Sequence, residues 1–382
     1  MRITMNRTAT IEALSPMMCA VGKTQIPGTD GILFEAKAPN ECVLTAYDTE
    51  KGVRRSIEAT VESEGSYIIP AQKLVQTLKV MDGDEVTLEV DAKLIACISS
   101  GKSSHKMNAI RAEDFPTIPR LKTERGFEIG QSILKKMLGK VAFAMGTNDQ
   151  RAVLNGCFFR VGDNKLHLVS CDTFKMARCT VETPVTDRSE VQATDAFSFI
   201  VPVKTVHELT RLLSDGEEEM TRIHLSRKFI VFEIGDLVFF SRLVDGEYID
   251  YDRILMRTHR IFVEIDKAAL VSALERAALV TEERIVGSVR AHVKLVFESG
   301  VLKVMATSAA GSTYDEIDVK QEGDDLLIAF NNRFLIDTVR ACESETLKLS
   351  MSTATTSINI EPVEAEEGSD DIFMLLPVRI KE

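Results

Sequence analysis

The sequence contains no tryptophan, and aromatic residues make up only 6% of its 382 positions. Proteins that bind single-stranded nucleic acid stack bases on aromatic side chains, so this scarcity argues against such a platform. No apolar run approaches the roughly 18 residues of a membrane-spanning helix. The first residues alternate apolar and polar side chains and form no signal peptide, so we expect a cytoplasmic protein without membrane contact.

Paired cysteines are also missing. The seven cysteines are scattered, no Cys-x-x-Cys motif occurs, and the six histidines have no ligand-like spacing. This pattern predicts reduced core cysteines rather than disulfides or a zinc site.

The motifs of two enzyme classes are incomplete. Gly22-Lys23-Thr24 resembles the end of a phosphate-binding loop, but Met17 stands where that loop needs its first glycine. Gly101-Lys102-Ser103 fails in the same way at Ala96. No Gly-x-Ser-x-Gly motif is present, so a hydrolase with a nucleophile elbow is unsupported. We therefore expect no catalytic residues and no cofactor.

Three segments of the chain share one pattern. Residues 68–78, 200–209 and 328–339 each begin with an apolar strand end and continue with apolar residues at helical spacing. An acidic turn and another strand follow each time, and a second helix candidate precedes each set. The copies are 132 and then 128 residues apart. The repeat predicts three α+β domains, at residues 1–124, 125–256 and 257–382.

The predicted helices carry positive charge in an acidic chain. The net charge is −12, which by itself argues against a protein that coats nucleic acid. The helix candidates nevertheless sum to +7 and leave −19 for the remainder. They are residues 7–19, 70–80, 129–141, 202–213, 266–279 and 331–341. Solvated helix faces often carry lysine, but recurrence of the bias favours a surface that attracts duplex nucleic acid without reading its bases.

Two stretches concentrate acidic residues. Asp245 to Asp252 holds four acids but lacks the spacing of an EF-hand, and we interpret it as a solvated loop between strands. Glu361 to Asp371 holds six acids with Pro362 and Gly368 and predicts a mobile hairpin loop.

Four stretches, in their order and spacing, together with the three-fold repeat, resemble one known family over the whole chain. They are Arg-Ala-Val-Leu-Asn-Gly at 151–156, Leu-Val-Asp-Gly-Glu-Tyr at 243–248, residues 331–338, and Leu-Leu-Pro-Val-Arg-Ile at 375–380. The family is the beta subunit of bacterial DNA polymerase III, the beta sliding clamp.

The resemblance implies three copies of a clamp-type domain and a head-to-tail homodimer that forms a six-domain ring. Duplex DNA would thread the helix-lined hole, and the ring would hold a polymerase at high effective concentration. The clamp loader and repair proteins would be further partners. Two alternatives remain: an enzyme that shares only the repeat, which the incomplete motifs disfavour, and a scaffold with no DNA in its hole, which the helix charge disfavours.

The resemblance also implies a pocket between the second and third domains that binds a short peptide with apolar anchors. Its wall would be formed by Leu154, Cys171, Thr173, Phe174, Lys175, Met176, Ile249, Arg253, Ile254, Asn331, Phe334, Thr355, Ser357, Met374, Leu376, Pro377, Val378 and Arg379.

Some of these positions depart from the family pattern. Many relatives follow the aspartate with Gly-His-Arg-Leu, whereas Asp172 is followed here by Thr-Phe-Lys-Met. Many carry proline where Ile249 stands, and their end reads Met-Pro-Met-Arg-Leu where residues 376–380 read Leu-Pro-Val-Arg-Ile. We expect Phe174 to make the pocket shallower and more apolar than in most relatives.

Contacts to DNA and a dimer seam are implied as well. The expected DNA contacts are Lys23, Lys73, Lys79, Lys135, Lys136, Lys140, Asn148, Arg151, Lys204, Arg211, Arg333 and Arg340. Such binding should be weak, non-specific and steeply salt-dependent. At the seam, an edge strand around His105 and Met107 would meet Leu279 and Val280 of the second subunit.

Relatives often place an apolar aromatic residue where His105 stands. Protonation of His105 would put a charge into this seam, so we expect the dimer to weaken at acidic pH. Sedimentation measured from about pH 8 to about pH 5.5 tests this, because histidine titrates in that range. An unchanged dimer dissociation constant would contradict the expectation.

Overall fold

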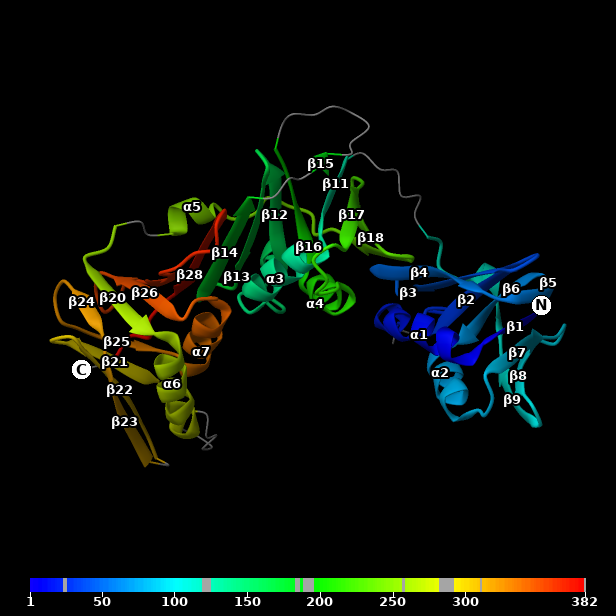
Figure 1. Cartoon of the computed structure of the whole chain (residues 1–382), viewed down its shortest axis with the longest axis horizontal. Coiled ribbons are helices and arrows are strands. Elements are labelled where there is room, and N and C mark those ends of the chain that lie inside the picture. Colours follow the sequence, from blue (N-terminus) through cyan, green and yellow to red (C-terminus); the bar gives the residue numbers. More distant parts are fainter. Residues whose placement is uncertain are drawn as a thin grey trace. The chain divides into compact units, whose positions relative to one another are not determined.

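The computed structural model describes residues 1–22, 26–118, 125–182, 186–187, 196–255, 258–281, 292–309 and 311–380. Two compact units make up the chain (Figure 1). Unit 1 comprises Met1–Ser132, Thr186–Ala193 and Arg211–Leu243, and unit 2 comprises Ile133–Val185, Thr194–Thr210 and Val244–Glu382. The expected boundary residues 124, 256 and 257 lie outside the described residues.

In its described residues, unit 1 contains two antiparallel sheets and two helices. The helices are α1 (Arg7–Met17), followed by a 3-10 turn at Met18–Ala20, and α2 (Ala71–Val80). The five-stranded sheet has the order β5 (Thr60–Ser63), β1 (Arg2–Asn6), β7 (Glu85–Val90), β8 (Ile95–Ser100) and β9 (Ser103–Asn108).

The ten-stranded sheet of unit 1 joins strands from two of the sequence repeats. Its order is β10 (Ile110–Arg111), β6 (Gly65–Pro70), β2 (Gly31–Lys37), β3 (Glu41–Tyr47), β4 (Lys51–Glu58), β19 (Leu237–Arg242), β18 (Phe229–Ile234), β17 (Met220–Leu225), β11 (Arg125–Gly130) and β15 (Thr186–Asp187). A short 3-10 helix, Ala112–Asp114, follows β10. The ladder between β4 and β19 makes this sheet continuous.

Unit 2 repeats the arrangement. Its nine-stranded sheet has the order β16 (Phe197–Pro202), β12 (Gly156–Gly162), β13 (Lys165–Cys171), β14 (Lys175–Glu182), β28 (Ser369–Leu375), β27 (Ile358–Pro362), β26 (Thr346–Met351), β20 (Ile261–Asp266) and β24 (Lys320–Glu322). Its four-stranded sheet has the order β23 (Gly311–Asp318), β22 (Val301–Ser308), β21 (Val293–Glu298) and β25 (Leu326–Phe330).

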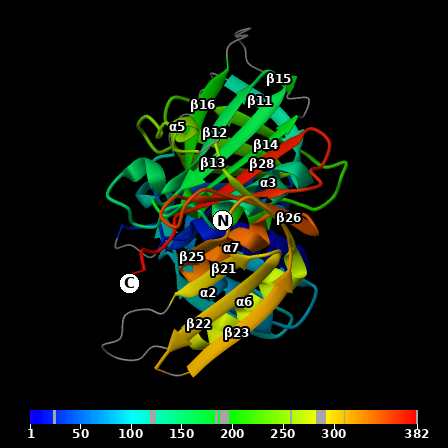
Figure 2. The same ribbon diagram turned by 90° about the vertical axis from the view of Figure 1, so that its left-hand side faces the viewer.

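Five helices belong wholly or mainly to unit 2. They are α3 (Gln131–Ala142), α4 (Val203–Leu212), α5 (Tyr251–Ile254), α6 (Lys267–Thr281) and α7 (Asn332–Ala341), with a 3-10 turn at Ala152–Leu154. Helix α6 packs on β22 and β23 and against α7 (Figure 2). Within the described residues, no helix is long and apolar enough to cross a membrane.

The six long helices confirm the predicted periodicity, because each buries one face and exposes another. In α2, Leu74 and Leu78 are fully buried while Lys73 and Lys79 are exposed. Helix α7 starts at the predicted position, where the Asn331 side chain accepts a hydrogen bond from the Phe334 amide. The alternation of strands and helices confirms the expected α+β class.

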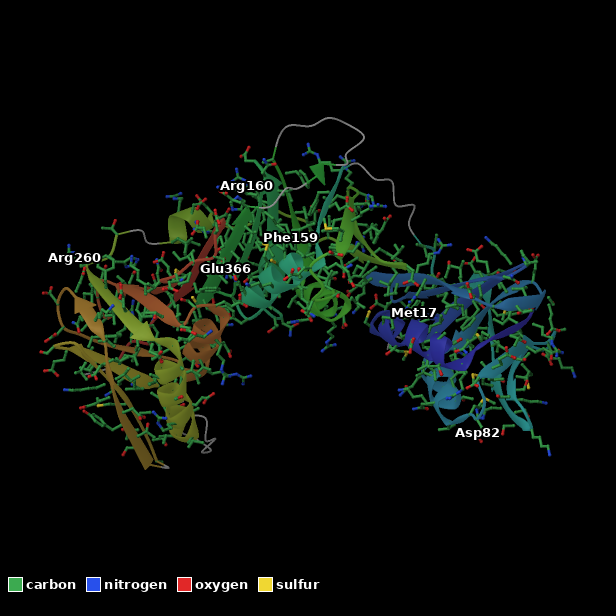
Figure 3. The ribbon with its side chains drawn as sticks, in the orientation of Figure 1. Met17, Asp82, Phe159, Arg160, Arg260 and Glu366 are labelled. Atoms are coloured by element: carbon green, nitrogen blue, oxygen red, sulfur yellow. The ribbon has the colours of Figure 1, made fainter. Side chains whose placement is uncertain are left out.

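Large aromatic side chains fill the cores of both units. Phe159, labelled in Figure 3, is fully buried on β12 and stacks on Phe199 of β16 with ring centres 5.0 Å apart. All seven cysteines are free thiols, and five of them are buried as expected of core cysteines, whereas Cys19 and Cys97 are partly exposed.

The second acidic stretch departs from the prediction at its end. Asp371 is not part of a loop: it lies in β28 with a side chain only 5% exposed, and its Oδ2 is 2.7 Å from Lys140 Nζ. The carboxylate is buried because its partner is buried with it. In the first stretch the acids are exposed, as predicted for a loop, although Tyr248 is buried and Asp250 caps the short helix α5.

The buried pair between Lys140 and Asp371 should stabilise unit 2. Asp371→Ala would leave the Lys140 ammonium in a buried site, which costs about 3–5 kcal/mol of unfolding free energy. The exposed pair of Lys165 and Glu182, at 2.7 Å, is the matched control, and Glu182→Ala should cost less than about 1 kcal/mol. Urea denaturation followed by circular dichroism measures both, and equal losses would contradict the prediction.

Candidate functional site

A cavity of about 460 Å³ opens in unit 2 where five segments of the chain meet. It is lined by Arg151, Leu154, Cys171, Thr173, Ile249, Ile254, Thr355, Thr356, Ser357, Met374 and Leu376. Nine of these residues were predicted from the sequence as pocket wall. Thr356 was missed, and Arg151 was assigned to DNA instead.

The floor of this pocket is an apolar cluster. Leu154, Cys171, Met176 and Met374 are buried together with Tyr248. The Tyr248 ring is further fixed by stacking on Phe158, with ring centres 5.0 Å apart. Burial raises the pKa of the Cys171 thiol, so that side chain stays neutral at physiological pH. The floor therefore offers an apolar surface without charge.

The rim adds a few polar groups. The hydroxyls of Thr355, Thr356 and Ser357 come from one turn between β26 and β27, which is closed by a hydrogen bond from the Thr356 amide to the Thr353 carbonyl. Arg151 contributes a guanidinium whose Nε lies 3.3 Å from an oxygen of Asp149. Carboxylates and histidines are absent from the residues that line the cavity. Such a surface suits the apolar side chains of a ligand.

The turn between β13 and β14 forms one side of the pocket. Asp172 Oδ1 accepts hydrogen bonds from the amides of Phe174 and Lys175, each at 3.0 Å. Thr173 between them has a φ of +83°, a left-handed conformation that is uncommon for a β-branched residue. The turn therefore holds the Thr173 side chain against the cavity.

The same turn occurs in the first repeat. Asp48 Oδ1 accepts hydrogen bonds from the amides of Glu50 and Lys51, at 2.9 and 2.8 Å, and Thr49 has a φ of +79°. Lys51 is buried, as is Lys175 of the second repeat. The aspartate, threonine and lysine thus belong to the architecture of the turn. The third position, occupied by Glu50 in one copy and Phe174 in the other, is the variable one.

Phe174 stands beside the cavity and does not line it. Its side chain is 56% exposed, and its ring centre is 6.0 Å from that of Phe334 on α7. The Phe174 carbonyl accepts a hydrogen bond from the Leu376 amide at 2.8 Å, and Leu376 does line the cavity. The two phenylalanine rings therefore continue the apolar surface past the edge of the pocket.

Lys175 was predicted to line the pocket wall, but it is not among the lining residues. Its side chain is buried and binds neighbouring groups of the protein. Its ammonium donates to the Phe143 carbonyl at 2.6 Å and to Asp172 Oδ2 at 2.7 Å. It also lies 4.9 Å from the centre of the Phe334 ring, a cation–π distance. Two of the three donors of this buried ammonium are therefore used within the protein.

Other predicted wall residues also lie off the cavity lining. Met176 is fully buried beneath it, and the side chain of Arg253 is 86% exposed. Asn331 caps α7. Pro377, Val378 and Arg379 continue past the lining; the Val378 amide donates to the Ala329 carbonyl of β25 at 2.8 Å. Nine of the predicted wall residues thus line the cavity, and the others lie around it.

The predicted DNA contacts fall into different environments. Lys73, Lys79 and Arg333 are exposed, and in the part of the chain that the structure describes no ion pair holds them. Lys204, Arg211 and Asn148 are exposed too, and Lys135 is half-buried. Arg340 pairs with Glu275. Lys23 lies outside the described residues.

The prediction that Lys140 contacts DNA is wrong. It is 6% exposed and bound to Asp371, so it has no surface to offer a phosphate. Lys136 is partly exposed but pairs with Glu343 and Glu366. Both partners lie more than 200 residues along the chain from Lys136.

The expected seam residues lie at an open sheet edge and on α6. β9 ends the five-stranded sheet, and a groove of about 830 Å³ runs between it and α2. His105 is exposed on β9, whereas Met107 is buried. On α6, Leu279 is 78% exposed and Val280 is buried. Val280 and Met107 thus pack mainly within their own units, and Leu279 and His105 are the exposed members of the predicted seam.

Three models of one family match the chain in sequence order. DNA polymerase III beta subunit, N-terminal domain, matches residues 1–119; the central domain matches 128–250; and the C-terminal domain matches 252–376. A beta sliding clamp of Pseudomonas putida is 29% identical over the full length of both chains. A beta sliding clamp of Staphylococcus aureus is 26% identical and covers 97% of this chain and 95% of its own.

Solved structures agree with this assignment. The DNA polymerase sliding clamp of Pseudomonas aeruginosa, crystallised with a ligand, has 26% identity and a TM-score of 0.89, with 100% of both chains covered. The fold is therefore that of the sliding clamps, processivity factors with no catalytic activity of their own. The chain belongs to the DNA polymerase III beta subunit family. The expectations of a non-enzymatic clamp with three clamp-type repeats are confirmed, and its role is in DNA replication.

The Phe174 ring should contribute to the affinity for apolar peptides. Phe174→His exchanges an apolar ring for a polar one, and loss of an aromatic contact worth about 0.5–1.5 kcal/mol weakens binding several-fold. Fluorescence anisotropy with a labelled clamp-binding peptide measures the dissociation constant. Met220→His, at an exposed site in unit 1, is the control. Equal affinity of the wild type and Phe174→His for the peptide would contradict the prediction.

Proposed function

We propose that two copies of this chain close head to tail into a ring around duplex DNA and tether a polymerase through the unit 2 pocket. The clamp loader and repair proteins would use the same pocket. The observation that carries the proposal is the repetition of the clamp-type unit, in which exposed cations recur on the helices of an acidic chain. Such a ring would work in the cytoplasm, where the bacterial chromosome lies.

The three domains of each subunit would span residues 1–124, 125–256 and 257–382. Two of them would contribute strands to each of the long sheets, as the ladders between β4 and β19 and between β14 and β28 suggest. Continuous sheets across these boundaries would make each unit stiff, and stiff units suit a ring that must stay closed.

The DNA contact would be electrostatic. Lys73, Lys79 and Arg333 are exposed and carry full charges that a phosphate backbone attracts. None of these side chains sits in a groove-reading motif, and contacts to phosphate alone carry no sequence information. Weak, sequence-independent binding of this kind lets a protein slide.

The seam would form between an open edge of each subunit. β9 carries Lys106, and β23, which ends the four-stranded sheet, carries Glu316 and Asp318. Opposite charges favour the pairing of these two edges across subunits. Exposed apolar residues on the neighbouring helices, Val80 on α2 and Leu279 on α6, would then pack together.

The pocket would hold a short linear segment of a partner. An apolar floor with hydroxyl groups at its rim suits one or two large apolar anchors of an extended peptide. Because the same pocket would serve several partners, they would compete for it. Tethering raises the local concentration of the partner at the DNA without any direct contact between the two.

Loading onto circular DNA tests the whole proposal. A clamp loader would assemble the labelled protein on nicked circular plasmid, and gel filtration would separate bound from free protein. We expect retention on circles and release after a restriction enzyme linearises them, because a ring slides off an end. Equal retention on circular and linear DNA would contradict the ring.

A variant at the seam is the matched control. Leu279→Asp puts a charge on an exposed apolar side chain without disturbing the subunit core. It should weaken the dimer in sedimentation and shorten retention on circles. A dimer as stable as that of the wild type would remove Leu279 from the seam.

A further inference from the structure

Carboxylates of the third repeat hold two lysines of helix α3. Lys136 Nζ is 3.1 Å from Glu343 Oε2 and pairs with Glu366 as well. Lys140 Nζ is 2.7 Å from Asp371 Oδ2 and 3.4 Å from Glu343 Oε2. Two ammonium groups thus meet three carboxylates, and the cluster carries a net negative charge. All five side chains belong to unit 2, and Glu366 is labelled in Figure 3.

The two lysines differ in exposure, and therefore in what they can do. The side chains of Lys140 and Asp371 are 7% and 5% exposed, so this pair is structural. The side chains of Lys136, Glu343 and Glu366 are 38%, 47% and 61% exposed. Lys136 is therefore close enough to solvent to meet a polyanion, but it is already engaged.

Lys136 and Glu366 both remain charged at neutral pH. Burial alone would lower the pKa of Lys136, but the hydrogen bonds that it donates to Glu366 and Glu343 outweigh burial and raise it. The hydrogen bond from Lys136 lowers the pKa of Glu366. The contact is therefore an ion pair throughout the physiological pH range.

The connections of the two acids show that they are held in place. Glu343 follows α7 directly, and the carbonyl of Cys342 at this helix end accepts a 2.6 Å hydrogen bond from Lys267. Glu366 lies in the turn between β27 and β28, where its carbonyl accepts hydrogen bonds from the Ser369 amide and hydroxyl. Ordered backbones therefore present both carboxylates to Lys136.

We propose that Glu343 and Glu366 are a built-in counter-charge that keeps Lys136 off the phosphate backbone and so limits how tightly the chain holds duplex DNA. The inference rests on the proposed DNA-encircling function. A lysine that a protein carboxylate already neutralises releases no counterion when DNA arrives, so it adds nothing to the salt dependence of binding. Lys73, exposed and with no ion pair among the described residues, is the contrasting case.

The first test removes the two carboxylates. Glu343→Gln with Glu366→Gln should free one cation, so that duplex binding becomes about threefold to tenfold tighter at low salt and its log–log salt slope steepens by about 0.9. Anisotropy of a fluorescein-labelled duplex, titrated at several NaCl concentrations, gives both numbers. Glu364→Gln with Glu367→Gln is the matched control, since it removes the same amount of charge from the turn that carries Glu366.

Those control residues are exposed, and neither forms an ion pair within the described part of the chain. An equal gain in the test and control variants would mean that net charge alone acts, and this would overturn the proposal.

The second test needs no change to the carboxylates and keeps the proposal falsifiable if the first variant folds poorly. Lys136→Gln in the otherwise unchanged chain should leave duplex affinity within about twofold, whereas Lys73→Gln should weaken it several-fold. In the Glu343→Gln, Glu366→Gln background, Lys136→Gln should cancel the gain. If Lys136→Gln alone weakens binding as much as Lys73→Gln does, Lys136 already contacts DNA and the counter-charge does not exist.

These outcomes separate the inference from the proposed function. Suppose that the wild-type chain is retained on circular plasmid and lost on linearisation, but the glutamate variants bind duplex DNA as the wild type does. That result refutes only the counter-charge. A chain that shows no salt-dependent duplex binding refutes both.

Discussion

The antiparallel ladder between β14 and β28 is the constraint on which unit 2 depends. It pairs Lys175 with Leu375 and Met176 with Met374, residues about 200 positions apart in the chain. Through this ladder, strands from the second and third repeats form one nine-stranded sheet. Burial of a sheet face fixes register strongly, since a one-residue slip would turn every core side chain outward.

The pocket is a direct consequence of that register. The ladder places Met374 beside Met176 in the floor and brings Leu376 next to the turn that carries Phe174. The same ladder places Asp371 opposite Cys179 and within reach of Lys140. One register therefore determines both the apolar binding surface and the buried ion pair behind it, so a substitution that shifts β28 would disturb both.

Features that depend on neighbours in sequence could be predicted, and features that depend on this ladder could not. The helices were located because buried residues recur at helical spacing, as Leu74 and Leu78 do. The partner of Lys140 lies 231 residues away, and no local pattern announces it. For this reason Asp371 was assigned to a loop, and Lys140 to DNA.

In the pocket, too, the sequence identified many of the residues but not the role of each side chain. Family resemblance gave nine of its lining residues, but it could not distinguish Lys175, which supports the wall, from Thr173, which forms it. Repetition within the chain could not have done so either. Asp48, Thr49 and Lys51 recur as Asp172, Thr173 and Lys175, so the recurrence identifies the turn and not which of its side chains faces the cavity.

A count of charges along the sequence also misses ion pairs between residues that are far apart in the chain. The helices sum to +7 in the sequence, but Lys140 is neutralised inside the protein and Lys136 at its surface. The cations left for DNA are therefore fewer than the count suggests. Each lost phosphate contact makes binding weaker and less dependent on salt. For a protein held on DNA by a closed ring, affinity is not what prevents loss. Weak contacts then let the ring slide more easily without shortening the time that it stays on DNA. The carboxylates that pair with the lysines of α3 would weaken the contacts in this way.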